Sequence, residues 1–293
     1  MSEHGNRKQA VARLQIVFSM ITFGSIGVFV KNISLIPAEI ALWRGVIAFA
    51  VLFIFLLASG KIAEIIKLKH KLWKLFLSGV AMGFNWILLF QAYNYTSVAL
   101  STLSYYFAPT LVIIASSILF KEKLNTKQIV CFLSSTLGLV LIIGVSGGGS
   151  SDMTGILFGL GAATLYATVI LFNKATGEID GITRTWLQFV SAVIVLLPYV
   201  YYTGGFHIME LENMGIINLL IIGIIHTGII YYMYFSSLAY LKGQQVAILS
   251  YIDPLVAVLA SVFILGEFIT ALQLLGGIII LIFALANEIK LKR

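Results

Sequence analysis

The sequence predicts an all-α polytopic membrane protein whose ten transmembrane helices form two inverted five-helix repeats, with both termini cytoplasmic. Composition is the first indication: of 293 residues, 60% are hydrophobic and 11% are charged, and the mean hydropathy is +1.01. A soluble fold of this size needs a more polar surface. Apolar runs of about 18–22 residues recur along the chain, each long enough to cross a ~30 Å hydrocarbon core as a helix.

The second indication is an internal repeat, because residues 90–128 match residues 235–273 at a constant offset of 145. Both copies read as a hydrophobic helix, a short connection, a helix containing proline, an acidic turn and another helix. The matched pairs are Phe90/Phe235, Tyr95/Tyr240, Tyr106/Tyr251, Pro109/Pro254, Ser116/Ser261, Glu122/Glu267 and Gln128/Gln273.

The hydrophobic pattern places the helices in order along the chain. Basic residues before the first run are typical of signal peptides, but the run is too long and lacks a small-x-small cleavage site, so we expect a retained span. The first repeat is expected over 14–145 and the second over 154–289, joined by the linker SGGGSSD. The expected helices cover residues 14–31, 38–58, 73–94, 98–120, 127–145, 154–173, 183–202, 215–240, 244–265 and 269–289.

The basic residues give the third indication. The chain carries 19 Lys and Arg residues and a net charge of +7. With the N-terminus inside, all of them except Lys31 and Arg44 fall on the inner side of the expected helices. This asymmetry is typical of proteins of the inner (plasma) membrane, with the lipid bilayer as partner, and argues against a nucleic-acid partner.

Five helices per repeat have a geometric consequence. An odd number makes the second copy enter the membrane from the opposite side, which relates the halves by a pseudo-two-fold axis in the membrane plane. Inverted repeats suit alternating access, in which exchanging the conformations of the two halves moves a cavity from one side to the other.

Short motifs in both halves carry a family resemblance, which covers roughly residues 14–289. They are Pro37…Trp43-Arg44, Ala108-Pro109…Lys121-Glu122-Lys123-Leu124 and Asp253-Pro254…Gly266-Glu267. The chain thereby resembles the paired EamA-type domains of the drug/metabolite transporter superfamily. That resemblance implies a ten-helix secondary transporter for amino acids, metabolites, drugs or sugar conjugates. The second half departs from the pattern, with Gln188 where a counterpart of Arg44 is expected.

Two prolines and two charges predict a cargo site at mid-membrane. Pro109 and Pro254 fall about halfway along their helices, where proline loosens the backbone, so we expect helix breaks and a cavity between helices 4 and 9. Asp253 is a candidate to bind a cargo amine or a coupling proton. Arg44 is a candidate to bind a cargo carboxylate; alternatively it extends outward to pair with Glu39.

Aromatic and polar residues of other spans are expected to complete this cavity by packing an apolar cargo or by holding an ammonium over a ring. The alternative is that they face lipid or pack the core. For His226 the alternatives are titration near neutral pH and neutral packing. Glu122 and Glu267 are expected to cap helices 5 and 10. The candidates are Asn85, Trp86, Tyr105, Tyr166, His226, Tyr231 and Tyr251.

Enzymatic signatures are weak. Gly144-Val145-Ser146-Gly147 matches the GxSG of intramembrane serine proteases, but it runs into a glycine-rich linker and lacks an evident histidine partner. Cys131 is the sole cysteine, so the sequence predicts neither a disulfide nor a multi-cysteine metal site, and no cofactor is expected. Gly155-x-x-x-Gly159 permits close helix packing or a homodimer contact.

Together these features predict a secondary transporter, not an enzyme, that exports small metabolites by alternating access. The leading cargo is an apolar or aromatic amino acid or a similar amphipathic amine, with Arg44 and Asp253 holding opposite charges. A passive cycle and exchange against a proton both stay open. The alternatives are a drug or other metabolite transporter of the same fold, and a membrane scaffold or sensor that moves no cargo.

Overall fold

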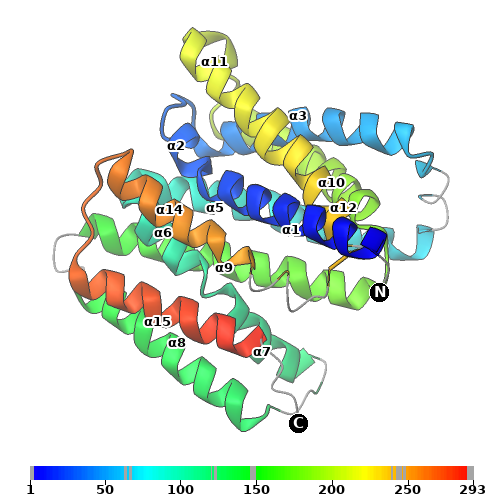
Figure 1. Ribbon diagram of the computed structural model, residues 1–293. Coiled ribbons are helices and arrows are strands. Elements are labelled where there is room, and N and C mark those ends of the chain that lie inside the picture. The colour runs from blue at the N-terminus through cyan, green and yellow to red at the C-terminus, as the bar shows by residue number, and fades with distance from the viewer. Residues whose placement is uncertain are drawn as a thin grey trace.

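The computed structural model describes residues 3–62, 65, 68–119, 121, 124–145, 150–238, 240–241, 246 and 249–288. Among the residues singled out in the sequence, Glu122, Lys123, Ser146 and Gly147 lie outside these ranges. The described part is helical and contains no strand. Its helices form a bundle in which the first and second halves of the chain interleave (Figure 1).

The helices follow the expected order. In the first half they are α1 (Glu3–Gly24), α2 (Ile26–Val30), α3 (Pro37–Ala58), η1 (Lys69–Lys71), α5 (Leu72–Tyr95), α6 (Val98–Tyr105), α7 (Ala108–Leu119) and α8 (Thr126–Val145). In the second half they are α9 (Ser150–Thr176), α10 (Gly181–Thr203), η2 (Ile208–Glu210), α11 (Asn213–Leu220), η3 (Ile221–Ile229), α12 (Ile230–Leu238), α14 (Ile252–Phe263) and α15 (Ala271–Glu288).

Seven helical segments in the described ranges are long and apolar enough to cross a membrane, and α14 and parts of α8 and α15 form three shorter apolar helices. These segments follow the ten expected spans in order. The first expected helix, 14–31, needs correction, because α1 begins at Glu3 and the helix is interrupted at Ser25. The helices expected over 98–120 and 244–265 are also interrupted, and helix 8 contains the π-helical segment η3.

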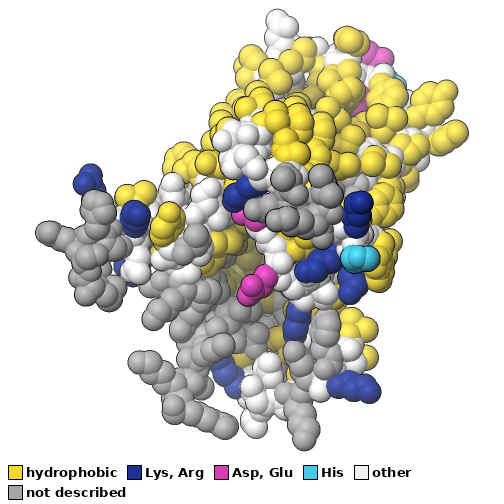
Figure 2. All heavy atoms as spheres, turned by 90° about the vertical axis from the view of Figure 1, so that its right-hand side faces the viewer, with side chains coloured by type: hydrophobic (Ala, Val, Ile, Leu, Met, Phe, Trp, Pro, Cys, Tyr) yellow, Lys and Arg dark blue, Asp and Glu magenta, His cyan; other side chains and the backbone are white. Residues whose placement is uncertain are grey.

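Basic side chains gather at one end of the bundle. The ends of α3 and α9 and the beginnings of α5 and α10 meet at the right-hand end of Figure 1. Figure 2 looks onto that end and shows Lys and Arg side chains spread over it. Those in or beside these connections include Lys61, Lys69, Lys71, Lys74, Lys174 and Arg184. The assignment of this end to the cytoplasm stays a prediction from the charge asymmetry.

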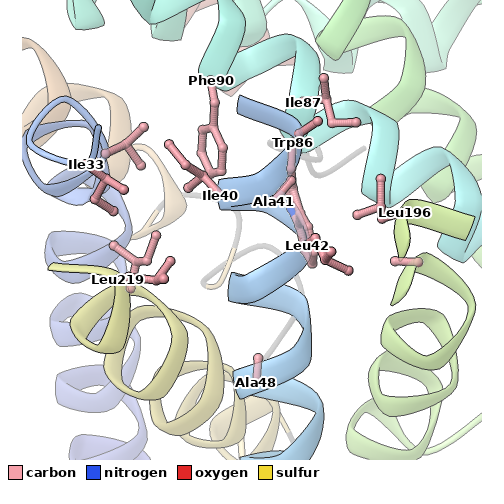
Figure 3. Close-up of a cluster of buried hydrophobic side chains, with 14 of the residues drawn as sticks. Ile33, Ile40, Ala41, Leu42, Ala48, Trp86, Ile87, Phe90, Leu196 and Leu219 are labelled. Carbon is pink, nitrogen blue, oxygen red and sulfur yellow. The ribbon is translucent and has the colours of Figure 1, made fainter. Parts of the chain in front are cut away.

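The main hydrophobic core joins the two halves. Side chains from α3 and α5 of the first half meet Leu196 of α10 and Leu219 of α11 in the second half (Figure 3). Small residues allow the backbones to approach, as is usual between helices in a bilayer. At Gly79 of α5, for example, an added Cβ would lie 2.3 Å from the carbonyl oxygen of Gln188 in α10.

The repeat is visible in the way two equivalent helices begin. Before α8, Asn125 and Gln128 exchange side-chain and backbone hydrogen bonds of 2.9 Å each. Before α15, Thr270 and Gln273 make the same reciprocal pair at 3.0 and 3.2 Å. These capping boxes satisfy N–H groups that the first helical turn leaves open. The expectation that Glu267 caps helix 10 is therefore wrong, since Thr270 does so.

Helices α3 and α10 occupy equivalent places in the two repeats and are tied together at both ends. At the basic end, Lys61 donates to the carboxylate of Asp180 at 2.6 Å. At the opposite end, the backbone N–H of His207 donates to the carboxylate of Glu39 at 2.8 Å, and the His207 ring lies 3.4 Å from it. Each contact joins a residue beyond the C-terminal end of one helix to a carboxylate at the N-terminal end of the other.

Asp180 has two structural functions at the basic end. Its carboxylate accepts from the backbone N–H of Thr183 at 3.1 Å as the N-cap of α10, in addition to its bond with Lys61. Burial alone would raise the pKa of Asp180, but the hydrogen bonds from Lys61 and Thr183 outweigh it and hold the pKa below its usual value.

We expect Asp180→Ala to lower the free energy of unfolding by about 1 kcal/mol, the usual cost of losing an N-cap. Because the folded-state pKa is lowered, the contribution of the charge is present above the unfolded pKa of about 4 and disappears as the pH falls through the folded value. Melting temperatures of purified protein from neutral to acidic pH test this. The gap between wild type and variant should narrow toward low pH, whereas a gap that widens there contradicts the assignment. Asp180→Asn, which keeps the cap acceptor, is the control.

Candidate functional site

The breaks in helices 4 and 9 fall at equivalent positions of the repeat. Helix α6 ends at Tyr105 and α7 begins at Ala108, while Tyr251 stands outside helix immediately before α14. Pro109 and Pro254 therefore lie in the first turn of α7 and α14, where a missing N–H costs no intrahelical hydrogen bond. In each case the helix is interrupted before the proline, and the proline does not kink a long, continuous helix.

The two breaks are joined by a hydrogen bond between the halves. The Tyr106 hydroxyl donates to Asp253 Oδ2 at 2.8 Å, and the Tyr106 ring centroid lies 6.2 Å from that of Tyr251. Asp253 is the second residue of α14, where the helix dipole favours a negative charge. Within the described ranges, Tyr106 is the one hydrogen-bond donor to this carboxylate, and no cation pairs with it.

Helix α1 packs directly against the turn that carries Asp253. At Gly24, the last residue of α1, an added Cβ would lie 2.4 Å from the Asp253 carbonyl oxygen and 2.7 Å from Val256 Cβ. Only glycine permits this approach, because both neighbouring groups belong to the rigid first turns of α14. The position of Asp253 thus depends on a residue more than 200 positions earlier in the chain.

Gly24→Ala should lower the free energy of unfolding by about 1–3 kcal/mol, the usual cost of overpacking a tight contact. The control is Gly45→Ala, where the nearest atom to an added Cβ is Val193 Cγ2 at 3.4 Å, an ordinary contact. Melting temperatures of the two purified variants give the comparison. An equal effect in both would show that the approach of α1 to α14 is not tight.

Arg44 lies on α3 and is 5% exposed. Its Nε donates to Thr227 Oγ1 at 2.7 Å, and its guanidinium carbon lies 4.6 Å from the centre of the Trp86 ring and 5.6 Å from that of Phe90. Thr227 also donates to the Ile222 carbonyl at 2.6 Å, five residues earlier, as the π-helical segment η3 allows. These contacts hold the guanidinium plane in a fixed place.

The alternative pairing of Arg44 with Glu39 is not found. Glu39 is fully buried, and its Oε1 accepts from the Trp43 ring N–H at 3.1 Å and from the His207 backbone. Among the described residues, Arg44 makes its one side-chain hydrogen bond through Nε, and no carboxylate pairs with it. Its terminal guanidinium nitrogens are therefore available to a ligand.

Aromatic rings lie near each of the two charges. Tyr231 lies 5.6 Å from Phe189 between ring centroids, and Phe189 lies 5.2 Å from Trp86, which contacts Arg44. On the other side, Tyr105 lies 6.1 Å from Tyr106, the residue that binds Asp253. Tyr105 lies 5.4 Å from Tyr166 between ring centroids. Tyr166 is 40% exposed, so only part of its surface is covered by the bundle. The result is a set of tyrosine rings near two opposite charges.

Two other candidates are buried. The His226 ring is 2% exposed, with Nε2 3.1 Å from Ser25 Oγ and Nδ1 3.3 Å from the Ile221 carbonyl oxygen. It thus joins the interruption after α1 to the π-helical segment. Asn85 donates to the Ala162 carbonyl at 2.6 Å in the seam between α5 and α9 and also interacts with Tyr105. Both side chains position the elements that carry the tyrosines.

Tyr106 and Thr227 are the residues that the sequence reasoning did not select. Tyr106 matches Tyr251 in the repeat, and that pairing was the available signal. Thr227 adjoins His226, but its link to Arg44 depends on tertiary packing and the π-helical turn.

Comparison with known proteins gives a consistent family. The EamA-like transporter family model matches residues 11–144 and again residues 153–287. The chain is 32% identical over 282 residues, 95% of its own length and 89% of the other protein, to the "Uncharacterized transporter YxxF" of Bacillus subtilis (strain 168). It is 27% identical over 172 residues, 55% of its length and 58% of the other, to the "Probable amino-acid metabolite efflux pump" of Salmonella typhimurium (strain LT2).

A crystal structure superposes with a TM-score of 0.63 at 17% identity, covering 95% of this chain and 96% of the other, which supports the fold alone. One family model matches each half of the chain, in agreement with the internal repeat. The chain belongs to the EamA-like transporter family.

Proposed function

We propose that this transporter exports zwitterionic amino acids with apolar or aromatic side chains across the inner (plasma) membrane. The observation that carries the proposal is the pair Arg44 and Asp253, two opposite charges inside the bundle, neither with a counter-charge among the described residues. Ionisable groups at membrane depth are expensive and are usually functional. A zwitterionic cargo would supply both missing partners.

In this proposal each charge has one part in holding the cargo. The terminal nitrogens of Arg44 bind the cargo carboxylate, a planar pairing for which guanidinium is well suited. Asp253, held by Tyr106, binds the ammonium group. Tyr231 and Tyr93 pack the cargo body between them.

The two helix breaks give the site a route to alternating access. Tyr106 belongs to the first half and Asp253 to the second, so cargo at Asp253 lies where the halves meet. Movement of one half against the other would expose it to one side and then to the other. Exchange against a proton would use the same carboxylate, because Asp253 could hold either an ammonium group or a proton.

The name of the Salmonella relative describes amino-acid metabolite efflux, which agrees with this cargo class. A drug or other metabolite transporter of the same fold is the second candidate, favoured by the set of tyrosine rings near the two charges. A cationic drug would need Asp253 and the rings but would leave Arg44 without a partner.

Ligand-dependent stability of the purified protein separates these possibilities, since a ligand that binds the folded state raises the melting temperature by mass action. The panel is phenylalanine, phenethylamine without the carboxylate, phenylpropionate without the amine, and a nucleoside. A shift largest for phenylalanine, together with its efflux from proteoliposomes, is the expected result. An equal shift for phenethylamine would favour the amine or drug transporter, and neither shift nor flux would favour the scaffold.

A further inference from the structure

A cavity with polar groups in its lining lies at the end of the bundle opposite the basic face. Its volume is about 150 Å³, and it is lined by the end of α2, the connection to α3 and the last turns of α5. Lys31 is the one charged residue among those that line it, and Asn94 and Tyr93 add polar groups. Lys31 is also the one lysine that the charge asymmetry leaves on this side of the membrane.

The floor of this cavity is also a wall of the Arg44 site. Phe90 and Tyr93 line the cavity, and the Phe90 ring lies 5.6 Å from the guanidinium carbon of Arg44. The Tyr93 ring centroid lies 6.2 Å from that of Phe90. The Phe90 ring is therefore shared by the cavity that Lys31 lines and the surroundings of Arg44.

Lys31 is paired with the carboxylate of Glu267, which other hydrogen bonds also hold in place. Lys31 Nζ binds Glu267 Oε1, while Oε2 accepts from the Val98 backbone at 2.7 Å and from Ser261 Oγ at 2.5 Å. Glu267 is thus fixed at the N-terminus of α6 even without the lysine. Lys31 can exchange Glu267 for another carboxylate while Glu267 Oε2 keeps both of its hydrogen-bond donors.

We propose that this cavity is a second cargo site, in which Lys31 binds the carboxylate of a cargo that has left Arg44. The inference rests on the proposed function and deepens it. Arg44 and Lys31 are two successive cations on one route, and Phe90 borders both sites. Glu267 competes with the cargo for Lys31, and its return to Lys31 releases the carboxylate to the outer side.

Exchange assays in proteoliposomes test the competition, with phenylalanine or phenethylamine added on the outer face. Lys31→Gln should raise the KM for phenylalanine about tenfold, because a charge-assisted hydrogen bond is lost, and leave the KM for phenethylamine unchanged. Glu267→Gln should lower the KM for phenylalanine, because glutamine keeps an acceptor for Val98 and frees Lys31. The control is Lys61→Gln, which breaks a lysine–carboxylate pair at the opposite end.

Opposite effects of the two variants are the decisive result, because a purely structural ion pair would make them act alike. Equal increases in KM for both compounds in both variants would overturn the inference. So would phenylalanine exchange that Lys31→Gln leaves intact, while the proposed function would stand. No phenylalanine exchange by the wild type overturns the proposed function, and the inference with it.

Thiol labelling locates the site independently of flux. Cys131 is buried in α8, so Asn94→Cys in a Cys131→Ala background places one exposed thiol at the cavity. Phenylalanine should slow its reaction with an impermeant maleimide added from outside, and Lys31→Gln should abolish that protection. Met209→Cys, on an outer connection at a side chain 95% exposed, is the unprotected control. Equal protection with and without Lys31 would overturn the inference.

Discussion

Asp253→Asn should reduce phenylalanine export by at least about tenfold and leave the fold intact. The amide is nearly isosteric and still accepts the Tyr106 hydroxyl through its oxygen, so the contact between the two breaks is kept. The lost component is the negative charge that would pair with the cargo ammonium. Removing one partner of a buried charge pair costs about 2–5 kcal/mol, and each 1.4 kcal/mol is tenfold in affinity.

Flux from proteoliposomes and ligand-induced melting shifts measure this loss. Phenylpropionate, which lacks the amine, is the matched ligand, because its binding should not depend on the charge of Asp253. Tyr106→Phe is the matched variant: it removes the hydroxyl donor and keeps the carboxylate, so it should impair transport less than Asp253→Asn. Equal losses for phenylalanine and phenylpropionate in Asp253→Asn would instead show that Asp253 only supports the fold.

The repeat made part of this site predictable from sequence. The match of Tyr106 to Tyr251 and of Pro109 to Pro254 indicated paired breaks at one depth, and the structure has both. The alignment of Gln128 with Gln273 likewise belongs to the shared capping boxes. Hydrophobic periodicity and the register of the repeat can be read directly from the sequence, because neither depends on which side chains meet in the folded protein.

Partners across the bundle were not predictable in the same way. Glu267 was expected at the start of helix 10, but it caps α6, which precedes it by more than 160 residues. Thr227, which binds Arg44, lies in a π-helical segment, where hydrogen bonds join residues five positions apart instead of four. Over so short a stretch, hydrophobic periodicity does not distinguish a π-helix from an α-helix. Glu39 is close to Arg44 in the sequence and was therefore a candidate partner for it, yet its carboxylate accepts a hydrogen bond from the His207 backbone.

Arg44→Met should abolish phenylalanine transport and at the same time leave the protein as stable as the wild type or more so, by up to about 3 kcal/mol. The buried guanidinium has one protein hydrogen bond and no counter-charge among the described residues, so its desolvation is poorly compensated. Methionine fills the space and keeps contact with the Trp86 and Phe90 rings. Thr227 retains its bond to the Ile222 carbonyl, so no buried hydroxyl loses its acceptor.

For Arg44→Met, the informative outcome is a loss of transport together with unchanged or higher stability. Replacing a residue that serves only packing should lower both stability and transport. Replacing a binding residue should lower transport but relieve the energetic cost of burying that residue. Melting temperature and flux are measured on the same preparation, with Arg44→Lys as the matched variant. Lysine keeps the charge but lacks the planar, forked donors, so its transport should be lower than that of wild type and its stability no higher. A large fall in the melting temperature of Arg44→Met would show that Arg44 is a structural residue. The carboxylate of the cargo would then need another cation, and Lys31 would be the residue to test in its place.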